Sequence, residues 1–239
     1  MAFGDFIQAA TAIDTSGTSA TIGGAGFTSN VTAGNWLVCG VRVGNSGTSA
    51  SLTSDSTPAS FTKAKEQNQG NDVHTSSVHH GINQAGAVKP TITISNPSSG
   101  TIRAVLCEYA GSPNTHVDVT ASDQGTSATP ASGATATRAD ATELQIGFES
   151  NGNGNAATAG SLFTIRSTQP ANKCAIEDVL RTTTGTQQAD FTLTSTQWAC
   201  LTATYSDSGG GGGGGGPLIR GGELLHGSLI RGGRLVADA

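Results

Sequence analysis

The chain has 239 residues and a formal net charge of −5, and charged residues make up only 12% of it. That share is about half the usual one, and Lys and Arg do not cluster, so composition argues against nucleic-acid binding. No apolar run reaches the roughly 18 residues of a membrane span. The printed start has no basic region followed by an apolar run, so we expect no secretory signal.

Short β-branched runs between clusters of Gly, Ser, Asn and Pro predict an all-β fold. Residues 91–94 alternate polar and apolar, as in a half-exposed strand. Residues 36–41 and 104–107 are apolar throughout, as in strands covered on both faces. Two packed sheets with these as central strands account for both kinds. The expected strands are 36–43, 50–54, 61–66, 73–79, 91–95, 102–109, 117–121, 143–149, 163–166, 175–181, 189–194 and 198–205.

Turn-forming residues fill the stretches between these strands. They predict connections at 17–26, 44–50, 68–72, 125–137 and 151–160. The low complexity of residues 125–137 indicates a long exposed connection. We place the head domain at residues 1–208.

The chain carries eight short motifs, at residues 33–38, 52–56, 91–94, 108–111, 143–147, 163–166, 177–178 and 198–200. Their order and spacing resemble a jelly-roll-type β-sandwich module of bacterial surface and phage structural proteins. The resemblance implies a jelly-roll-like two-sheet β-sandwich and no agreed activity. One departure is that residues 55–58 lack the module's usual Gly-Asn turn, so that loop is expected to differ.

The C-terminus carries a polyglycine linker, residues 209–216, followed by a repeated segment, residues 217–239. Each repeat has an apolar pair, a polar residue and glycines, and it is too short to bury its apolar pairs alone. We therefore predict a short glycine-rich β-repeat stem that intertwines with other copies or adds a strand to a partner's groove; a flexible tether is the alternative. The expected oligomerisation or anchoring residues are Leu218, Ile219, Arg220, Leu224, Leu225, Leu229, Ile230, Arg231, Leu235 and Val236.

Four cysteines lie far apart in apolar runs without metal-ligand spacing. Buried thiols are the favoured interpretation, and one or two inter-strand disulfides are the alternative. They are Cys39, Cys107, Cys174 and Cys200.

The histidines do not form a metal site in this pattern. His79 and His80 face opposite sides of a strand, while His74 and His80 share a face but lie about 20 Å apart; His116 is remote in sequence. We expect exposed or inter-strand hydrogen-bonding histidines and no metal or cofactor.

Three acids interrupt apolar runs, namely Glu108, Glu177 and Asp178. A carboxylate pair can hydrolyse glycosides when suitably spaced, but adjacent strand residues face opposite ways. The favoured interpretation is structural, with each acid accepting strand hydrogen bonds or pairing with Arg103, Arg166 or Arg181.

Sugar binding needs exposed aromatic rings. Trp36 and Trp198 lie in apolar runs and are expected in the core, which leaves Tyr109 and Tyr205. The sequence therefore offers few aromatic rings for carbohydrate binding.

The sequence predicts a non-enzymatic phage virion structural protein, a capsid decoration protein or head fibre. It would be a homotrimer that contacts a major capsid protein or other virion proteins at the virion surface after assembly in the host cytoplasm. The alternative is a carbohydrate-binding adhesin or tail-fibre receptor-binding protein that binds cell-surface glycans.

Overall fold

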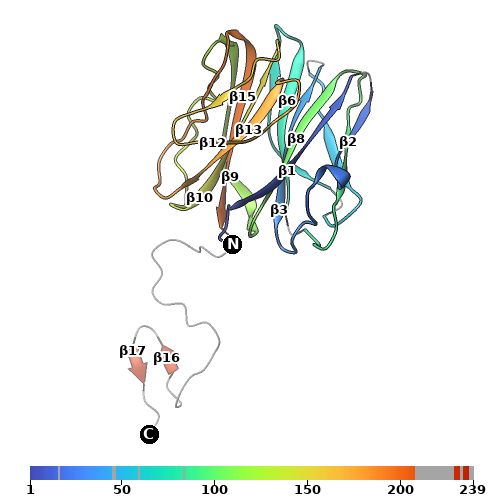
Figure 1. The fold of residues 1–239 in the computed structure, drawn as a ribbon. Helices are drawn as coiled ribbons and strands as arrows, with labels where there is room; N and C mark the ends of the chain where they lie inside the picture. Colours follow the sequence, from blue (N-terminus) through green and yellow to red (C-terminus); the bar gives the residue numbers. More distant parts are fainter. Residues whose placement is uncertain are drawn as a thin grey trace.

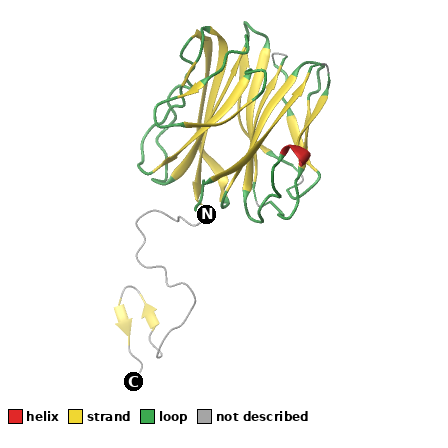
Figure 2. Ribbon diagram, viewed as in Figure 1, coloured by secondary structure: helices red, strands yellow, loops and turns green. Residues whose placement is uncertain are grey.

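The computed structural model describes residues 1–15, 17–44, 47–58, 60–82, 84–207, 229–231 and 234–236, with the backbone alone for 114–116 and for the last two ranges. Within these ranges the chain is all-β (Figure 2), and its one helical piece is the 3-10 turn η1, Gly24–Gly26. No helix there is long and apolar enough to cross a membrane.

A five-stranded antiparallel sheet, here the central sheet, occupies the middle of the molecule (Figure 1). Its order is β1-β8-β3-β6-β5. The strands are β1 (Phe6–Asp14), β8 (Ile102–Tyr109), β3 (Trp36–Val43), β6 (His74–Gly81) and β5 (Thr62–Gln69).

A second five-stranded antiparallel sheet, here the C-terminal sheet, packs on one face of the central sheet, in the order β12-β13-β10-β15-β9. Its strands are β12 (Thr164–Thr168), β13 (Cys174–Arg181), β10 (Glu143–Asn151), β15 (Thr196–Asp207) and β9 (Pro113–Ser127).

A three-stranded antiparallel sheet, here the small sheet, covers the other face of the central sheet, in the order β2-β7-β4. Two further antiparallel pairs are β11 with β14 and β16 with β17. The strands are β2 (Ser19–Gly23), β7 (Thr91–Ser95), β4 (Ser51–Ser54), β11 (Thr158–Ala159), β14 (Phe191–Thr192), β16 (Leu229–Arg231) and β17 (Arg234–Val236).

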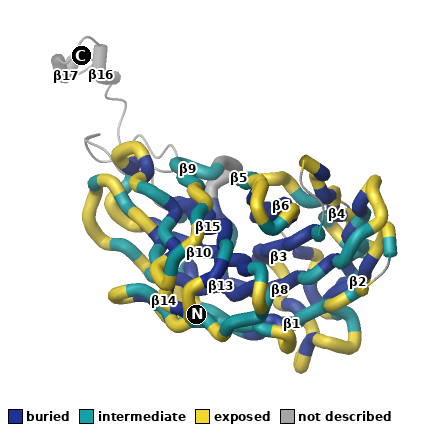
Figure 3. The backbone as a smooth tube through the Cα atoms, turned by 90° about the horizontal axis from the view of Figure 1, so that it is seen from above, coloured by how far each residue is buried: buried dark blue, intermediate teal, exposed yellow. Residues whose placement is uncertain are grey.

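The middle strands of the central sheet, β3, β6 and β8, are therefore buried on both faces, and the view from above shows this for β3 and β8 (Figure 3). All eight residues of β3 are buried. Leu37 and Cys39 pack in the core against the small sheet, while Trp36 and Val38 pack in the core against the C-terminal sheet. This two-sided burial explains why residues 36–41 are apolar throughout, whereas β7, on the small sheet, alternates in burial as the sequence predicted.

The core between the two large sheets changes character along the strands. One end is aromatic: the Trp36 ring lies 4.7 Å from Tyr205 and 5.4 Å from Tyr109 between centroids. The middle is aliphatic and includes Ile146 and Leu201. The other end is polar.

Residues 128–138 run alongside residues 185–193 and exchange backbone hydrogen bonds with them. Ser132 is 1% exposed and Thr135 5%, and the Ser132 amide bonds the Ala189 carbonyl at 2.9 Å. The prediction of an exposed connection at 125–137 is therefore wrong in part.

The predicted strands recur in the structure, and β3, β7 and β8 have the predicted bounds. The strands β1, β2 and β11 were not predicted, and the connections predicted at 17–26 and 151–160 are wrong where they cover β2 and β11. β1 and β2 are edge strands rich in small or polar residues, in which the apolar signal is weak. The expected two-sheet sandwich is incomplete because β2 completes a third sheet.

Gly40 marks a tight contact between the large sheets. A methyl group there would collide with the Phe148 ring. We predict that Gly40→Ala lowers the free energy of unfolding by about 1–3 kcal/mol through overpacking, measured by urea denaturation.

The matched control is Gly70→Ala, where a Cβ would meet nothing within 4 Å. Phe148→Leu should restore part of the stability lost in Gly40→Ala. Equal stability of the two alanine variants would contradict the close contact.

Candidate functional site

Glu108 organises the connection that follows η1. Its carboxylate accepts hydrogen bonds from Gln8 Nε2 at 2.6 Å, from Asn35 Nδ2 at 2.6 Å and from the Thr32 amide at 3.0 Å. The side chain is fully buried on the face of the central sheet opposite the aromatic core. These bonds support the structural interpretation of this acid.

Glu177 and Asp178 have separate environments, as strand alternation predicted. Asp178 accepts two bonds from Arg166 Nε, at 2.9 and 2.8 Å, which confirms one of the predicted arginine partners. Glu177 Oε2 accepts the Gly160 amide at 3.0 Å, and its Oε1 is buried without a partner. Burial raises the pKa of Glu177 to about 8.

A second acid with a raised pKa, Glu149, lies with Glu177 on the outer face of the C-terminal sheet. Burial raises the pKa of Glu149 to about 8, and the nearby Glu177 adds to the shift. The register places Gly147 opposite Glu177 and Glu149 opposite Ala175, so the two acids are diagonal neighbours. Raised carboxyl pKa values also occur at catalytic acids, but both side chains are at most 1% exposed.

A hydrogen-bond chain crosses between the two large sheets. Asp72 Oδ2 lies 2.8 Å from His74 Nδ1, and His74 Nε2 lies 2.8 Å from Ser150 Oγ. The order Asp–His–Ser matches that of a hydrolase triad. However, Ser150 Oγ also bonds Ser76 Oγ, and both His74 and Ser150 are fully buried. The chain therefore joins the sheets and offers no exposed nucleophile.

The pKa values of Asp72 and His74 agree with a structural role for this hydrogen-bond chain. The hydrogen bond between Asp72 and His74, together with Arg42, lowers the pKa of Asp72 to about 2. Burial lowers the pKa of His74. Asp72 and His74 are close in sequence, but only the fold brings Ser150 to them.

His79 and His80 are also buried, so the expectation of exposed histidines is wrong for them. His80 lies edge-on to Tyr205, with ring centroids 5.2 Å apart, while His79 bonds Ser77 Oγ at 2.9 Å. Burial lowers the pKa of each to about 4. The side chain of His116 lies outside the described residues.

The aromatic candidates for sugar stacking are buried as well. Trp36 and Trp198 are in the core, as predicted. Tyr109 and Tyr205 are both 0% exposed, so their assignment as sugar-stacking rings is wrong. They pack on Trp36, which a sequence without alignment does not reveal. All four cysteines are buried free thiols, so the favoured interpretation is confirmed.

A pocket of about 420 Å³ lies beside the N-terminus. The paired Arg166 and Asp178 line it together with Phe6, and the Arg166 guanidinium lies 5.2 Å from the Phe6 ring centroid. An aromatic ring, a carboxylate and a guanidinium can recognise a polar ligand such as a sugar.

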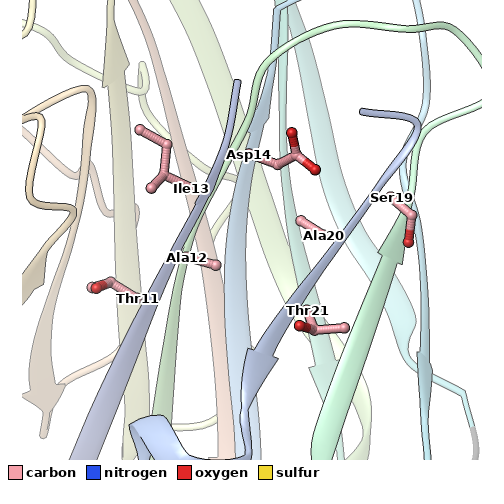
Figure 4. A pocket seen from close by; sticks show the side chains of 7 residues that line it. All are labelled: Thr11, Ala12, Ile13, Asp14, Ser19, Ala20 and Thr21. Atoms are coloured by element: carbon pink, nitrogen blue, oxygen red, sulfur yellow. The ribbon is translucent and has the colours of Figure 1, made fainter. Parts of the chain in front are cut away.

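A groove of about 470 Å³ runs between β1 and β2, the edge strands of two different sheets (Figure 4). Ala12, Asp14 and Ala20 point into it. Asp14 accepts a hydrogen bond from the Gly17 amide at 3.0 Å. Edge strands that flank a groove are suited to strand addition by an extended peptide.

Half of the predicted stem residues lie in paired strands. Leu229, Ile230 and Arg231 of β16 pair with Val236, Leu235 and Arg234 of β17 in antiparallel register. Leu218, Ile219, Arg220, Leu224 and Leu225 lie outside the described residues, as does the polyglycine linker at 209–216.

No protein-family model, curated protein or solved structure matches this chain. Within the described residues, no group of three or more His, Cys, Asp or Glu residues is placed to hold a metal ion.

The Glu108 contacts generate a first test. Glu108→Gln replaces one carboxylate oxygen by an amide NH2 group, which then faces a hydrogen-bond donor instead of accepting from it. We therefore predict a loss of about 2–3 kcal/mol in the free energy of unfolding. Glu66→Gln, in a partly exposed pair with Lys63, should cost under about 1 kcal/mol. Chemical denaturation measures both, and equal costs would remove Glu108 from its anchoring role.

The raised carboxyl pKa values generate a second test. Above about pH 6.5 the unfolded Glu149 and Glu177 are ionised, while the folded groups, with pKa values of about 8, keep their protons. The unfolded state then binds fewer protons, so stability should fall from pH 6.5 to 8 by up to about 1.4 kcal/mol per unit for each group. His74, His79 and His80, whose pKa values burial lowers, oppose this fall up to about pH 7.5, because their unfolded forms are still partly protonated there.

Glu149→Gln should flatten that slope by about one group's share, as measured by denaturation in steps of pH. Glu66→Gln is the control, because the pKa of Glu66 is lowered, partly by Lys63 and Ser49. Stability that is constant or rising between pH 6.5 and 8 would contradict the assignment.

Proposed function

We propose that this chain is a non-enzymatic structural protein of a phage virion, a capsid decoration protein or head fibre. The jelly-roll-like head would be displayed on the virion surface, and the C-terminal stem at 217–239 would hold it to the major capsid protein or another virion protein. Self-association as a homotrimer through the stem is part of this proposal.

The observation that carries the proposal is the β16–β17 pair. Each strand has three residues, and an isolated two-stranded hairpin is marginally stable in water. The paired residues Ile230 and Leu235 therefore need an apolar surface from other copies or from a partner.

The sequence extends this argument to the whole stem. Residues 218–225 read LIRGGELL and residues 229–236 read LIRGGRLV, so the same pattern recurs. Two such units on each of several symmetric copies give many weak contacts, and avidity then supplies the retention that one contact lacks.

The arrangement of the head also supports a structural role. Glu108, His74 and Asp178 are committed to hydrogen bonds inside the head. Their burial is the pattern of groups that stabilise a fold.

The second candidate is a carbohydrate-binding adhesin or tail-fibre receptor-binding protein. The pocket lined by Phe6 and Arg166 favours it, because it combines an apolar ring with a partly exposed charged donor that Asp178 holds in place. The ligand would then be a cell-surface glycan bound by the head.

Solution mass tests the proposal. We predict that the full chain is a trimer or larger by light scattering and that residues 1–207 alone are a folded monomer. Ile230→Asp should weaken assembly at least about tenfold, because it places a charge where an apolar contact is required. Ala239→Asp adds the same charge outside the paired strands and should assemble normally.

Binding assays distinguish the two candidates. Retention on empty capsids that soluble sugars do not affect supports the structural role. Binding to cells or glycan arrays that a soluble sugar inhibits, and that Arg166→Gln abolishes, would contradict it and support the adhesin. A monomeric full chain without capsid retention would also contradict the structural role.

A further inference from the structure

The polar end of the main core carries two arginines side by side. Arg42 on β3 and Arg103 on β8 are direct partners in the antiparallel register. Strand alternation gives Arg42 the same face as Trp36 and Val38, which pack toward the C-terminal sheet. Like charges placed directly opposite each other destabilise a sheet, so this pair requires a compensating charge.

The protein supplies one carboxylate to this pair. Arg42 Nη2 contacts Asp72 Oδ2 at 2.7 Å, and that same oxygen is bonded to His74. The Nε atoms of Arg42 and Arg103 are both buried without a hydrogen-bond partner. Donors therefore outnumber acceptors at this end.

A third cation lies close by. Partial burial lowers the pKa of Lys173, and the charges of Arg42 and Arg103 lower it further. Partial burial and Arg42 likewise lower the pKa of Arg103. Lys173 immediately precedes β13, the strand that lies across from β3 and β8.

The neutral neighbours do not change this balance. Burial raises the pKa of the Cys174 thiol and lowers that of His74, so neither is charged near pH 7. Glu149, on the far face of the C-terminal sheet, is mostly protonated there because its pKa is about 8. The charged groups at this end are therefore three cations, Arg42, Arg103 and Lys173, and one carboxylate, Asp72.

The second arginine–aspartate pair in the head is balanced. Arg166 meets Asp178, which accepts both of its bonds from that side chain. The Arg42 end differs from that pair, because Arg42 faces a second arginine and shares one carboxylate with His74.

We propose that Arg42, Arg103 and Lys173 form a binding site for an oxyanion, either a phosphate or a carboxylate group of a ligand. Arg103, Lys173 and Asp72 are partly exposed and give access from solvent, whereas Arg42 is 5% exposed and forms the inner wall. Planar guanidinium groups match the oxygens of both anions, and the ammonium group adds a point charge. This site is independent of the stem and of the proposed virion role.

Thermal unfolding of the full chain with added anions tests the site. A ligand that binds only the native state raises Tm with its concentration. We expect sodium phosphate or sodium acetate to raise Tm more than sodium chloride at the same pH and ionic strength. A response to phosphate alone assigns a tetrahedral ligand, and a response to acetate alone assigns a carboxylate.

The variants Arg103→Gln and Lys173→Gln should each weaken anion binding at least about tenfold, measured by calorimetric titration. Lys65→Gln removes the same charge from β5, outside the cluster, and should bind as the parent does. In chloride, Arg103→Gln should be at least as stable as the parent, because it removes the opposed charge.

Equal Tm shifts in phosphate, acetate and chloride would overturn the proposal. An unchanged affinity in both cluster variants would also overturn it. If Arg103→Gln fails to fold, Arg103 has a structural role, and the test then depends on Lys173→Gln. Unchanged anion affinity in Lys173→Gln would overturn the proposed site.

Discussion

Burial of the central sheet on both faces is the constraint on which the rest of the structure depends. Where the sheet is covered on both faces, at β3, β6 and β8, a polar side chain costs stability unless it finds a partner inside the protein. Glu108 meets this requirement on one face and His74 on the other. The same constraint explains the aromatic packing around Trp36, where large rings fill one end of the core.

The polar partners also define how the layers are joined. The bond between His74 and Ser150 connects the central sheet to the C-terminal sheet, and the Glu108 contacts connect β8 to the chain leading from the small sheet. Such bonds are directional, whereas apolar contacts are not, so they fix how the layers align. Charged residues are few in this chain, and several of those within the head serve this purpose.

Much of the fold could be predicted from the sequence because its strongest strands are apolar or regularly alternating. The apolar character of residues 36–41 and 104–107 predicted β3 and β8 in this way. The edge strand β2 was missed because Ser, Thr and Gly are also loop residues. The contacts of the candidate sites were beyond reach, since Arg42 and Arg103 or His74 and Ser150 meet only through long-range register. The stem pattern was visible as a repeat, but repetition alone does not identify what covers it.

The four free thiols are distributed over the three hydrophobic cores of the head. Cys39 lies in the core under the small sheet, Cys107 and Cys174 in the core between the large sheets, and Cys200 beneath the outer covering segments. Burial raises the pKa of each, which suppresses the reactive thiolate in the native state. Alkylation of each cysteine therefore reports the opening of its own layer, so the molecule contains a residue-specific record of the order in which its cores are lost.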